Sequence, residues 1–131
     1  MTNHRKFSAL VLGFALTAIF TVGVWPPEVA AQVSFSEDVS PIIELRCLEC
    51  HQPGGAGYER SGLDLRTYEG LMRGTKYGSM ITPGSWIESN LLAVIEHRTA
   101  RETWMPHNKK ELSKCETMSF RHWVMQGARN N

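Results

Sequence analysis

The strongest hydrophobic pattern of the chain lies at its beginning. A basic stretch at residues 4–6 precedes an uncharged apolar run over residues 7–24. This order is typical of a secretory signal peptide, and the small side chains at residues 29–31 predict cleavage after residue 31. The run also just reaches the length of a membrane-spanning helix, so a retained anchor is the alternative. In both cases the positive-inside rule puts residues 32–131 outside the cytoplasm.

Helical periodicity returns soon after this segment. Ser36 and the two acidic residues behind it predict a helix start, because a serine caps a helix and acidic side chains suit its first turn. Apolar Val39, Ile42 and Ile43 then recur at helical spacing up to Cys47. The pattern predicts a first helix that ends at this cysteine.

The middle of the chain combines turn signals with short periodic pieces. Residues 52–62 are rich in glycine and predict a loop. Residues 63–66 alternate apolar with charged side chains, which indicates a short extended piece. Thr67 is expected to cap a brief helix over residues 68–73.

Two S-x-x-E patterns predict the starts of two further helices, because this spacing makes a capping box. Ser85 with Glu88 precedes apolar residues that recur until about His97, and Ser113 with Glu116 opens the last helix. The sequence thus predicts an all-α domain with long loops, which are uncommon in a compact domain unless they wrap something. The apolar face of the last helix consists of Phe120, Trp123 and Val124, and Gly127 ends it.

Charge narrows the possible partners. The chain has 14 Lys and Arg against 13 Asp and Glu, and removing residues 1–31 takes away Arg5, Lys6 and Glu28, which leaves twelve of each sign. No basic stripe with interleaved aromatic residues is present, so nucleic acid is not expected as a partner. A domain of this size buries a modest core and gains from a large cofactor.

The spacing of the cysteines indicates the kind of cofactor that the domain binds. Cys47 and Cys50 are separated by two residues and followed by His51, and the only other cysteine is Cys115. Two thiols on one turn can reach the two vinyl groups of haem, and the adjacent histidine then points at the iron. The alternative, a structural zinc site, usually needs four closed ligands. The motif therefore predicts one covalently bound haem c per chain, with His51 as an iron ligand.

A second axial ligand has to come from a segment that can fold over the other haem face. Met105 lies in an irregular segment beside Pro106, and we predict that it is this ligand. His107 is the alternative, and an iron site without a second protein ligand is a third possibility. The full set of candidates is Met72, Met80, Met105, Met118, Met125, His97, His107 and His122.

Several short motifs occur in a characteristic order over about residues 38–128. They are C-L-E-C-H, S-G-L-D-L-R, I-T-P-G-S with E-S-N-L-L, W-M-P, and H-W-V-M-Q-G-A. As an ordered set they resemble the small class I c-type cytochromes, most closely the planctomycete-type cytochrome c domain. The resemblance implies a cytochrome c-like fold wrapped around one haem, with His51 proximal and Met105 distal. It also implies that the first and last helices cross with Trp123 in the core. The family commonly has a second proline where this chain has His107.

The expected ligands determine the expected function. A haem with histidine and thioether ligands has no vacancy for oxygen or peroxide, so we expect an electron carrier and not an enzyme. Its partners would be redox proteins in the periplasm or at the outer face of the cytoplasmic membrane, with possible membrane association through residues 7–24. The chain would be a shuttle or the cytochrome subunit of a membrane-associated or dehydrogenase complex. The alternatives are a small haem peroxidase and a sensor that exchanges ligands at Met105 or His107.

Two further groups of residues have candidate roles, although solvated or partly buried side chains are the simpler interpretation of both. The first group is cationic and could pair with a haem propionate; it consists of Arg66, Arg73 and Lys76. The second forms a soft stripe on the last helix that could dock a redox partner; it consists of Cys115, Met118, His122 and Met125.

Overall fold

The computed structural model describes residues 31–131. The apolar run at residues 7–24 lies outside this range, so the signal peptide or anchor remains a prediction. Within the described range, no helix is both long enough and apolar enough to cross a membrane.

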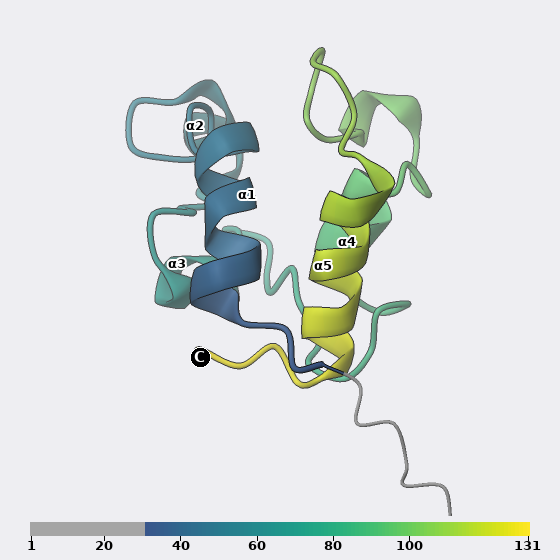
Figure 1. Ribbon diagram of the computed structural model, residues 1–131. Coiled ribbons are helices and arrows are strands. Elements are labelled where there is room, and N and C mark those ends of the chain that lie inside the picture. Colours follow the sequence, from purple (N-terminus) through teal and green to yellow (C-terminus); the bar gives the residue numbers. More distant parts are fainter. Residues whose placement is uncertain (1–30) are drawn as a thin grey trace, which may run out of the picture.

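Short helices joined by turns make up the described part of the chain, and no strand forms there apart from two isolated bridges. Figure 1 shows α1, α2 and α3 on one side of the molecule and α4 and α5 on the other. This confirms the prediction of a small, mostly helical domain. The elements are η1 (Phe35–Val39), α1 (Ser40–Arg46), α2 (Ala56–Ser61), α3 (Tyr68–Arg73), α4 (Asn90–Ile95), η2 (Arg101–Thr103) and α5 (Lys114–Met125).

The first helix combines a π-helical turn, η1, with α1, and it ends at Cys47 as predicted. Its start differs from the prediction. The hydroxyl of Ser34, and not that of Ser36, accepts the capping hydrogen bond from the Glu37 amide at 3.2 Å. Ser36 instead donates its hydroxyl to the carbonyl of Asn131 at 3.0 Å. Ser34 also donates to this carbonyl, at 2.8 Å, so both serines join the first helix to the C-terminus and only Ser34 caps it.

The glycine-rich stretch at residues 52–62 is not simply a loop, because α2 forms inside it. Gly55 precedes this helix with extended backbone, and Gly62 follows it in the left-handed conformation at φ 74°. Glycine is the residue that best tolerates such a left-handed helix end. Two of the glycines thus delimit a helix that composition alone predicts as irregular.

The predicted caps had different outcomes. Thr67 caps α3, and Ser113 forms a full capping box with Glu116 at the start of α5, both as predicted. The Ser85–Glu88 pair does not open a helix, because α4 begins only at Asn90. The hydroxyl of fully buried Ser89 bonds the Thr82 amide at 3.0 Å and the Ser85 carbonyl at 2.7 Å, which holds residues 82–89 as turns.

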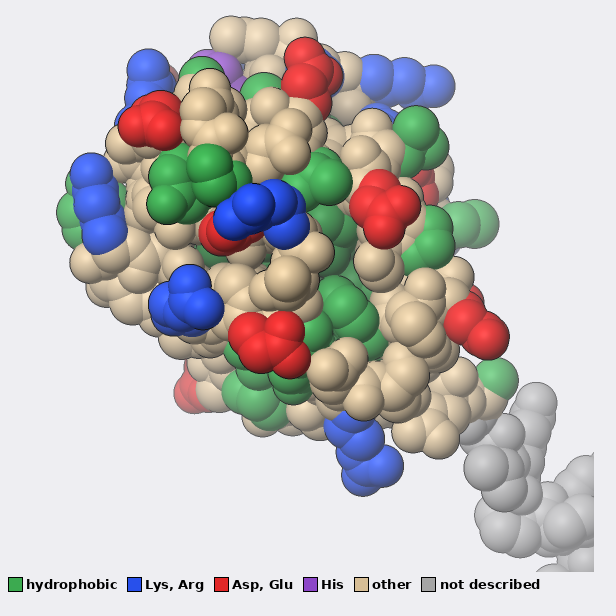
Figure 2. All heavy atoms as spheres, turned by 90° about the vertical axis from the view of Figure 1, so that its left-hand side faces the viewer, with side chains coloured by type: hydrophobic (Ala, Val, Ile, Leu, Met, Phe, Trp, Pro, Cys, Tyr) green, Lys and Arg blue, Asp and Glu red, His purple; other side chains and the backbone are tan. Residues whose placement is uncertain are grey.

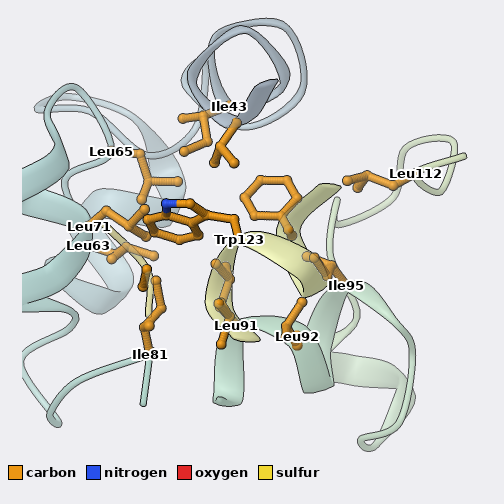
Figure 3. Close-up of a cluster of buried hydrophobic side chains, with 14 residues drawn as sticks. Ile43, Leu63, Leu65, Leu71, Ile81, Leu91, Leu92, Ile95, Leu112 and Trp123 are labelled. Carbon is orange, nitrogen blue, oxygen red and sulfur yellow. The ribbon is translucent and has the colours of Figure 1, made fainter. Parts of the chain in front are cut away.

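The hydrophobic core lies around α5, which packs against η1 and α4, and it includes Ile43 of α1 and Leu71 of α3 (Figure 3). Trp123 is 1% exposed, and its ring lies 5.5 Å from that of Phe35 and 6.4 Å from that of Tyr68. The expectation that Trp123 belongs to the core is confirmed. The buried side chains are Val39, Ile43, Leu63, Leu65, Leu71, Ile81, Leu91, Leu92, Ile95, Leu112, Phe120, Trp123, Val124 and Ala128.

The face formed by α1, α2 and α3 carries charges of both signs. In Figure 2, lysine and arginine side chains alternate with aspartate and glutamate over this face, and apolar side chains lie between them. Basic and acidic side chains are thus mixed on this side of the molecule, in keeping with their equal numbers in residues 32–131.

Candidate haem site

A mostly apolar cavity of about 540 Å³ lies between the two halves of the domain. Its volume falls within the range of about 300–1,000 Å³ that is usual for ligand and cofactor sites. The end of α1, the helix α2, the helix α4 and the segment after η2 all contribute to its walls. The apolar part of the lining includes Ala56, Leu63, Leu65, Met80, Leu91, Val94, Ile95 and Met105.

The C-x-x-C-H motif forms a tight turn on one wall of this cavity. The amides of Cys50 and His51 both donate to the Cys47 carbonyl at 3.1 Å, so the motif folds directly after the last turn of α1. Cys47, Cys50 and His51 all line the cavity, and both cysteines are free thiols. Burial raises the pKa of the Cys47 thiol to about 11. The three residues that sequence predicts to bind haem are thus brought together.

The environment of the His51 ring is suited to a metal ligand. Its Nδ1 atom is buried and has no hydrogen-bond partner among residues 31–131. Burial lowers the pKa of His51 and the backbone carbonyl of Leu63 partly offsets this, so the neutral ring that ligates metals is favoured. A buried, neutral imidazole beside two free thiols suits a metal-bearing group that is attached through those thiols.

Glycine at position 57 allows α2 to approach the His51 ring closely. A Cβ atom at Gly57 would lie 2.8 Å from His51 Cε1 and 2.9 Å from Nε2. It would also lie 2.9 Å from the carbonyl oxygen of Cys50. Real Cβ atoms essentially never make contacts this short, so a residue larger than glycine would have to displace the motif or α2.

On the opposite wall, the structure reduces eight candidate distal ligands to three. Met80, Met105 and His107 line the cavity. Met72 packs against the core, and His122 is exposed on α5. Met118, Met125 and His97 are also not among the residues that line the cavity.

Met105 reaches the cavity from an irregular segment that starts after η2. Its amide donates to the carbonyl of Val94 in α4 at 3.1 Å, and Pro106 follows through a cis peptide bond. This segment is therefore attached to the helix that forms the wall beside it.

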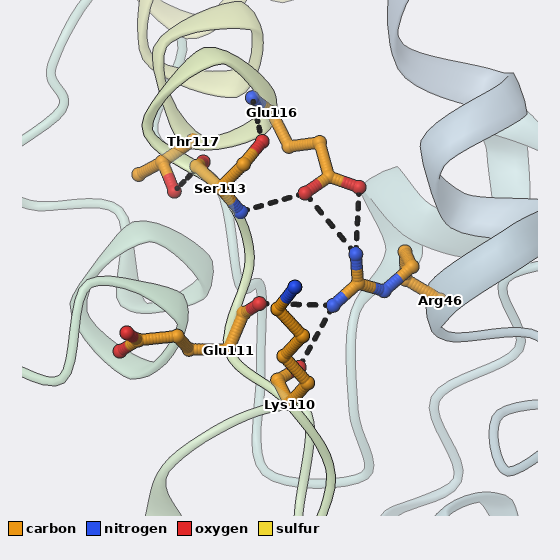
Figure 4. A network of polar contacts seen from close by, with 6 residues as sticks. All are labelled: Arg46, Lys110, Glu111, Ser113, Glu116 and Thr117. Atoms are coloured by element: carbon orange, nitrogen blue, oxygen red, sulfur yellow. Dashed lines mark hydrogen bonds and ion pairs between the residues drawn. The ribbon is translucent and has the colours of Figure 1, made fainter.

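Arg46, the residue before the motif, connects the two walls (Figure 4). Its guanidinium donates to the Glu116 carboxylate at 2.9 Å and to the carbonyls of Lys110 and Glu111 at 2.8 and 2.9 Å. Lys109 makes a second connection through an ion pair with Glu49, which lies inside the motif. The segment that carries Met105 is thus fixed to the end of α1.

The cationic residues at the cavity differ from those that sequence suggested. Arg66 pairs with Asp64 at 2.7 Å, and neither Arg73 nor Lys76 is among the residues that line the cavity. Arg60, on α2, does line it and has no ion-pair partner in the described range. Sequence analysis missed Arg60 because the glycines around it predict a loop, whereas the structure has Arg60 on the helix α2.

The stripe of Cys115, Met118, His122 and Met125 on α5 remains a prediction as a docking surface. Cys115 and Met125 are exposed, and across residues 31–131 no three His, Cys, Asp or Glu side chains are grouped so that they could hold a metal ion. The same finding leaves the zinc alternative at Cys47 and Cys50 without further ligands.

The comparison with protein families agrees with this site. The family model for planctomycete cytochrome C matches residues 47–107, a segment that begins at the first cysteine of the motif and includes Met105. Residues 47–107 therefore form a planctomycete cytochrome C domain, a kind of domain that carries electrons rather than acting as an enzyme. This family implies covalent haem, with which the spacing of the two cysteines is consistent. Neither the curated proteins nor the solved structures gave a match.

Proposed function

We propose that residues 32–131 form an exported single-haem cytochrome c that carries electrons between redox proteins. Cys47 and Cys50 would hold the haem through thioether bonds, and His51 and Met105 would ligate its iron. The observation that carries this proposal is the shared cavity, which the C-x-x-C-H turn and Met105 both line.

The chain supplies the ligands and the surroundings of the group. Bound haem supplies a one-electron couple, the oxidation and reduction of its iron. His51, favoured in its neutral form by burial, offers an imidazole nitrogen, and Met105 offers a soft thioether sulfur. The apolar side chains of Leu91, Val94 and Ile95 exclude water from the cavity. A low dielectric and a methionine ligand both favour the reduced state and raise the potential.

Arg60 is our candidate for a contact with a haem propionate. It is the arginine at the cavity whose charge is not already taken up by a carboxylate, whereas Arg46 is bound to Glu116 and two carbonyls. An exposed ion pair between Arg60 and a propionate would contribute modestly to the affinity for haem. It would also offset the negative charge of that propionate.

The proposed location follows from the N-terminal pattern together with the family. Cytochromes of the c type typically work outside the cytoplasm, and residues 4–31 have the order of charged, apolar and small residues expected of an export signal. The working place would be the periplasm or the outer face of the cytoplasmic membrane. The partners would be a donor and an acceptor protein, with the chain as a shuttle or as the cytochrome subunit of a larger complex.

Optical spectra of the haem-loaded protein test this function. The protein is measured oxidised, reduced, and reduced under carbon monoxide, and a reductive titration counts the electrons taken up per chain. We expect one electron per chain, a weak far-red absorption in the oxidised form, and no change on addition of carbon monoxide. Rapid binding of carbon monoxide without the far-red absorption would contradict the carrier and favour an enzyme or sensor with an open site.

A further inference from the structure

The C-terminal end of α4 has an unusual residue at its reversal point. The amide of Arg98 donates back to the carbonyl of Ala93 at 2.9 Å, and His97 between them adopts a left-handed conformation with φ 56°. Glycine or asparagine usually occupies such a position, and a residue other than glycine with a positive φ is uncommon. The contacts of the His97 side chain therefore bear on why it stands here.

The His97 side chain is held in one orientation. Its ring stacks on that of Trp104 with the centroids 4.3 Å apart and the planes within 4°. The Trp104 indole is itself fixed by a hydrogen bond from Nε1 to the Thr99 carbonyl at 2.8 Å. Only 23% of the His97 side chain is exposed, and its Nδ1 lies 3.7 Å from the Glu111 carboxylate.

This orientation directs His97 at the backbone of Met105. His97 Nε2 lies 3.3 Å from the Met105 carbonyl oxygen, and because a carbonyl only accepts, Nε2 is the donor. The Met105 amide already donates to the Val94 carbonyl at 3.1 Å. Both backbone polar groups of Met105 are therefore bound by the last turns of α4, although the methionine lies in an irregular segment.

We propose that His97 is a positioning residue for the distal ligand: its Nε2–H group holds the Met105 carbonyl so that the thioether stays directed into the cavity. This inference rests on the proposed function, because it assumes that Met105 binds the iron. His97 does not line the cavity and would not touch the cofactor, so its effect would be transmitted through the Met105 backbone.

Competition with imidazole measures how firmly Met105 is held. An added ligand binds the oxidised iron only when the methionine has left, so its apparent affinity rises with the open fraction. Loss of one hydrogen bond should raise that affinity about tenfold. The protein used is the haem-loaded chain, and its far-red absorption is recorded in the same titration.

Three substitutions separate the hydrogen bond from the packing of the ring. His97→Phe keeps a ring for Trp104 but has no donor, and His97→Asn suits the left-handed backbone but is too short to reach the carbonyl. His97→Gln restores a donor near the position of Nε2. We expect about tenfold tighter imidazole binding for His97→Phe and His97→Asn, and a value within about twofold of the parent protein for His97→Gln.

The same substitutions in a Met105→Ala background identify the route of the effect. If His97 acts through Met105, then adding His97→Phe to Met105→Ala changes imidazole binding by less than about twofold, because the interaction is already lost. A further large change in that background would mean that His97 merely keeps the cavity closed, and this would overturn the inference. Equal imidazole binding by His97→Phe, His97→Asn and the parent protein would overturn it as well.

Measurements on the Met105→Ala protein distinguish a wrong role for His97 from a wrong assignment of Met105 as the iron ligand. If it keeps the far-red absorption and the imidazole affinity of the parent protein, Met105 is not the ligand and the proposed function loses its distal residue. If it loses the far-red absorption and binds imidazole more tightly than the parent protein, while the His97 variants do not change, only the role of His97 is wrong. Should His97→Phe fail to mature with haem, the His97→Asn and His97→Gln pair still decides, because these two side chains differ by one methylene.

Discussion

The C-x-x-C-H turn and the Met105 segment face the same cavity but are held there by different means. The turn is fixed by local backbone bonds, since the amides of Cys50 and His51 both donate to Cys47. The Met105 segment has no regular structure and is held by contacts from α4 and from Arg46. One wall is therefore encoded by neighbouring residues, and the other by residues far away in the sequence.

This difference implies different sensitivities. Changes in the turn should decide whether the cofactor is bound at all, whereas changes in the distal contacts should alter how tightly the second ligand is held. The predictions below start with the turn, where the expected effects are largest, and proceed to the distal contacts.

The largest effect is expected from the two thiols. The double substitution of Cys47→Ser and Cys50→Ser should abolish covalent haem, because no thioether bond can form. Haem staining after denaturing electrophoresis measures this directly. Cys115→Ser is the matched control and should keep the full stain, since Cys115 is exposed on α5. Stain retained in the double variant would refute the attachment site.

Substitution of Gly57 tests how closely α2 is packed against the turn. Gly57→Ala places a Cβ 2.8–2.9 Å from the His51 ring and the Cys50 carbonyl. We expect a loss of about 1–3 kcal/mol in the free energy of unfolding, the usual effect of overpacking. Urea unfolding of the haem-loaded protein provides the measurement. An unchanged midpoint would mean that α2 can withdraw from His51 at no cost.

Removal of the Arg46 side chain should weaken the connection between the two walls. Arg46→Gln leaves the Glu116 carboxylate and the carbonyls of Lys110 and Glu111 without their donor. We expect a loss of about 1–3 kcal/mol in the free energy of unfolding, because the Glu116 carboxylate is partly buried and would lose its partner. Arg66→Gln is the control, since its exposed pair with Asp64 should contribute less than about 1 kcal/mol. Equal effects in urea unfolding would show that Arg46 is an ordinary surface residue.

A smaller effect should appear as a dependence of stability on pH. The backbone amide of Ser113, followed by its hydroxyl and Arg46, holds the pKa of Glu116 below its ordinary value of 4.5. A lowered pKa in the folded state stabilises the fold above the pKa of the unfolded chain, and this contribution is lost as the pH falls through the folded value. Unfolding midpoints measured from pH 6 down to about 3 should therefore fall less steeply for Glu116→Gln than for the parent protein.

A control and a contradicting result apply to this pH series. Glu88→Gln, in the turn before α4, should leave the slope unchanged, because Glu88 forms no ion pair within the described range. Parallel curves for Glu116→Gln and the parent protein would mean that the charge of Glu116 does not contribute.

The same contrast explains how much the sequence could predict. Cys47, Cys50 and His51 could be recognised because their chemistry depends on spacing along a single turn. The capping box of Ser113 and Glu116 was equally local and was confirmed. The match of residues 47–107 to the planctomycete cytochrome C family confirmed the resemblance that the ordered motifs indicated.

Predictions failed where a motif or composition did not show which residue takes the role. Ser85 and Glu88 have the spacing of a cap, yet buried Ser89 bonds residues 82 and 85, and the helix starts only at Asn90. Ser34 and not Ser36 caps the first helix, and α2 forms within a stretch whose glycines predict a loop. The role of Arg60 and the contact of His97 with Met105 depend on tertiary packing, so no local pattern announces them.

The most direct test of the account compares the three residues that could supply the distal ligand. Met105→Ala, Met80→Ala and His107→Ala are each loaded with haem and measured for far-red absorption when oxidised and for carbon monoxide binding when reduced. The account predicts that Met105→Ala alone loses the absorption and binds carbon monoxide. If instead Met80→Ala or His107→Ala does so while Met105→Ala resembles the parent protein, the proposed ligand is wrong.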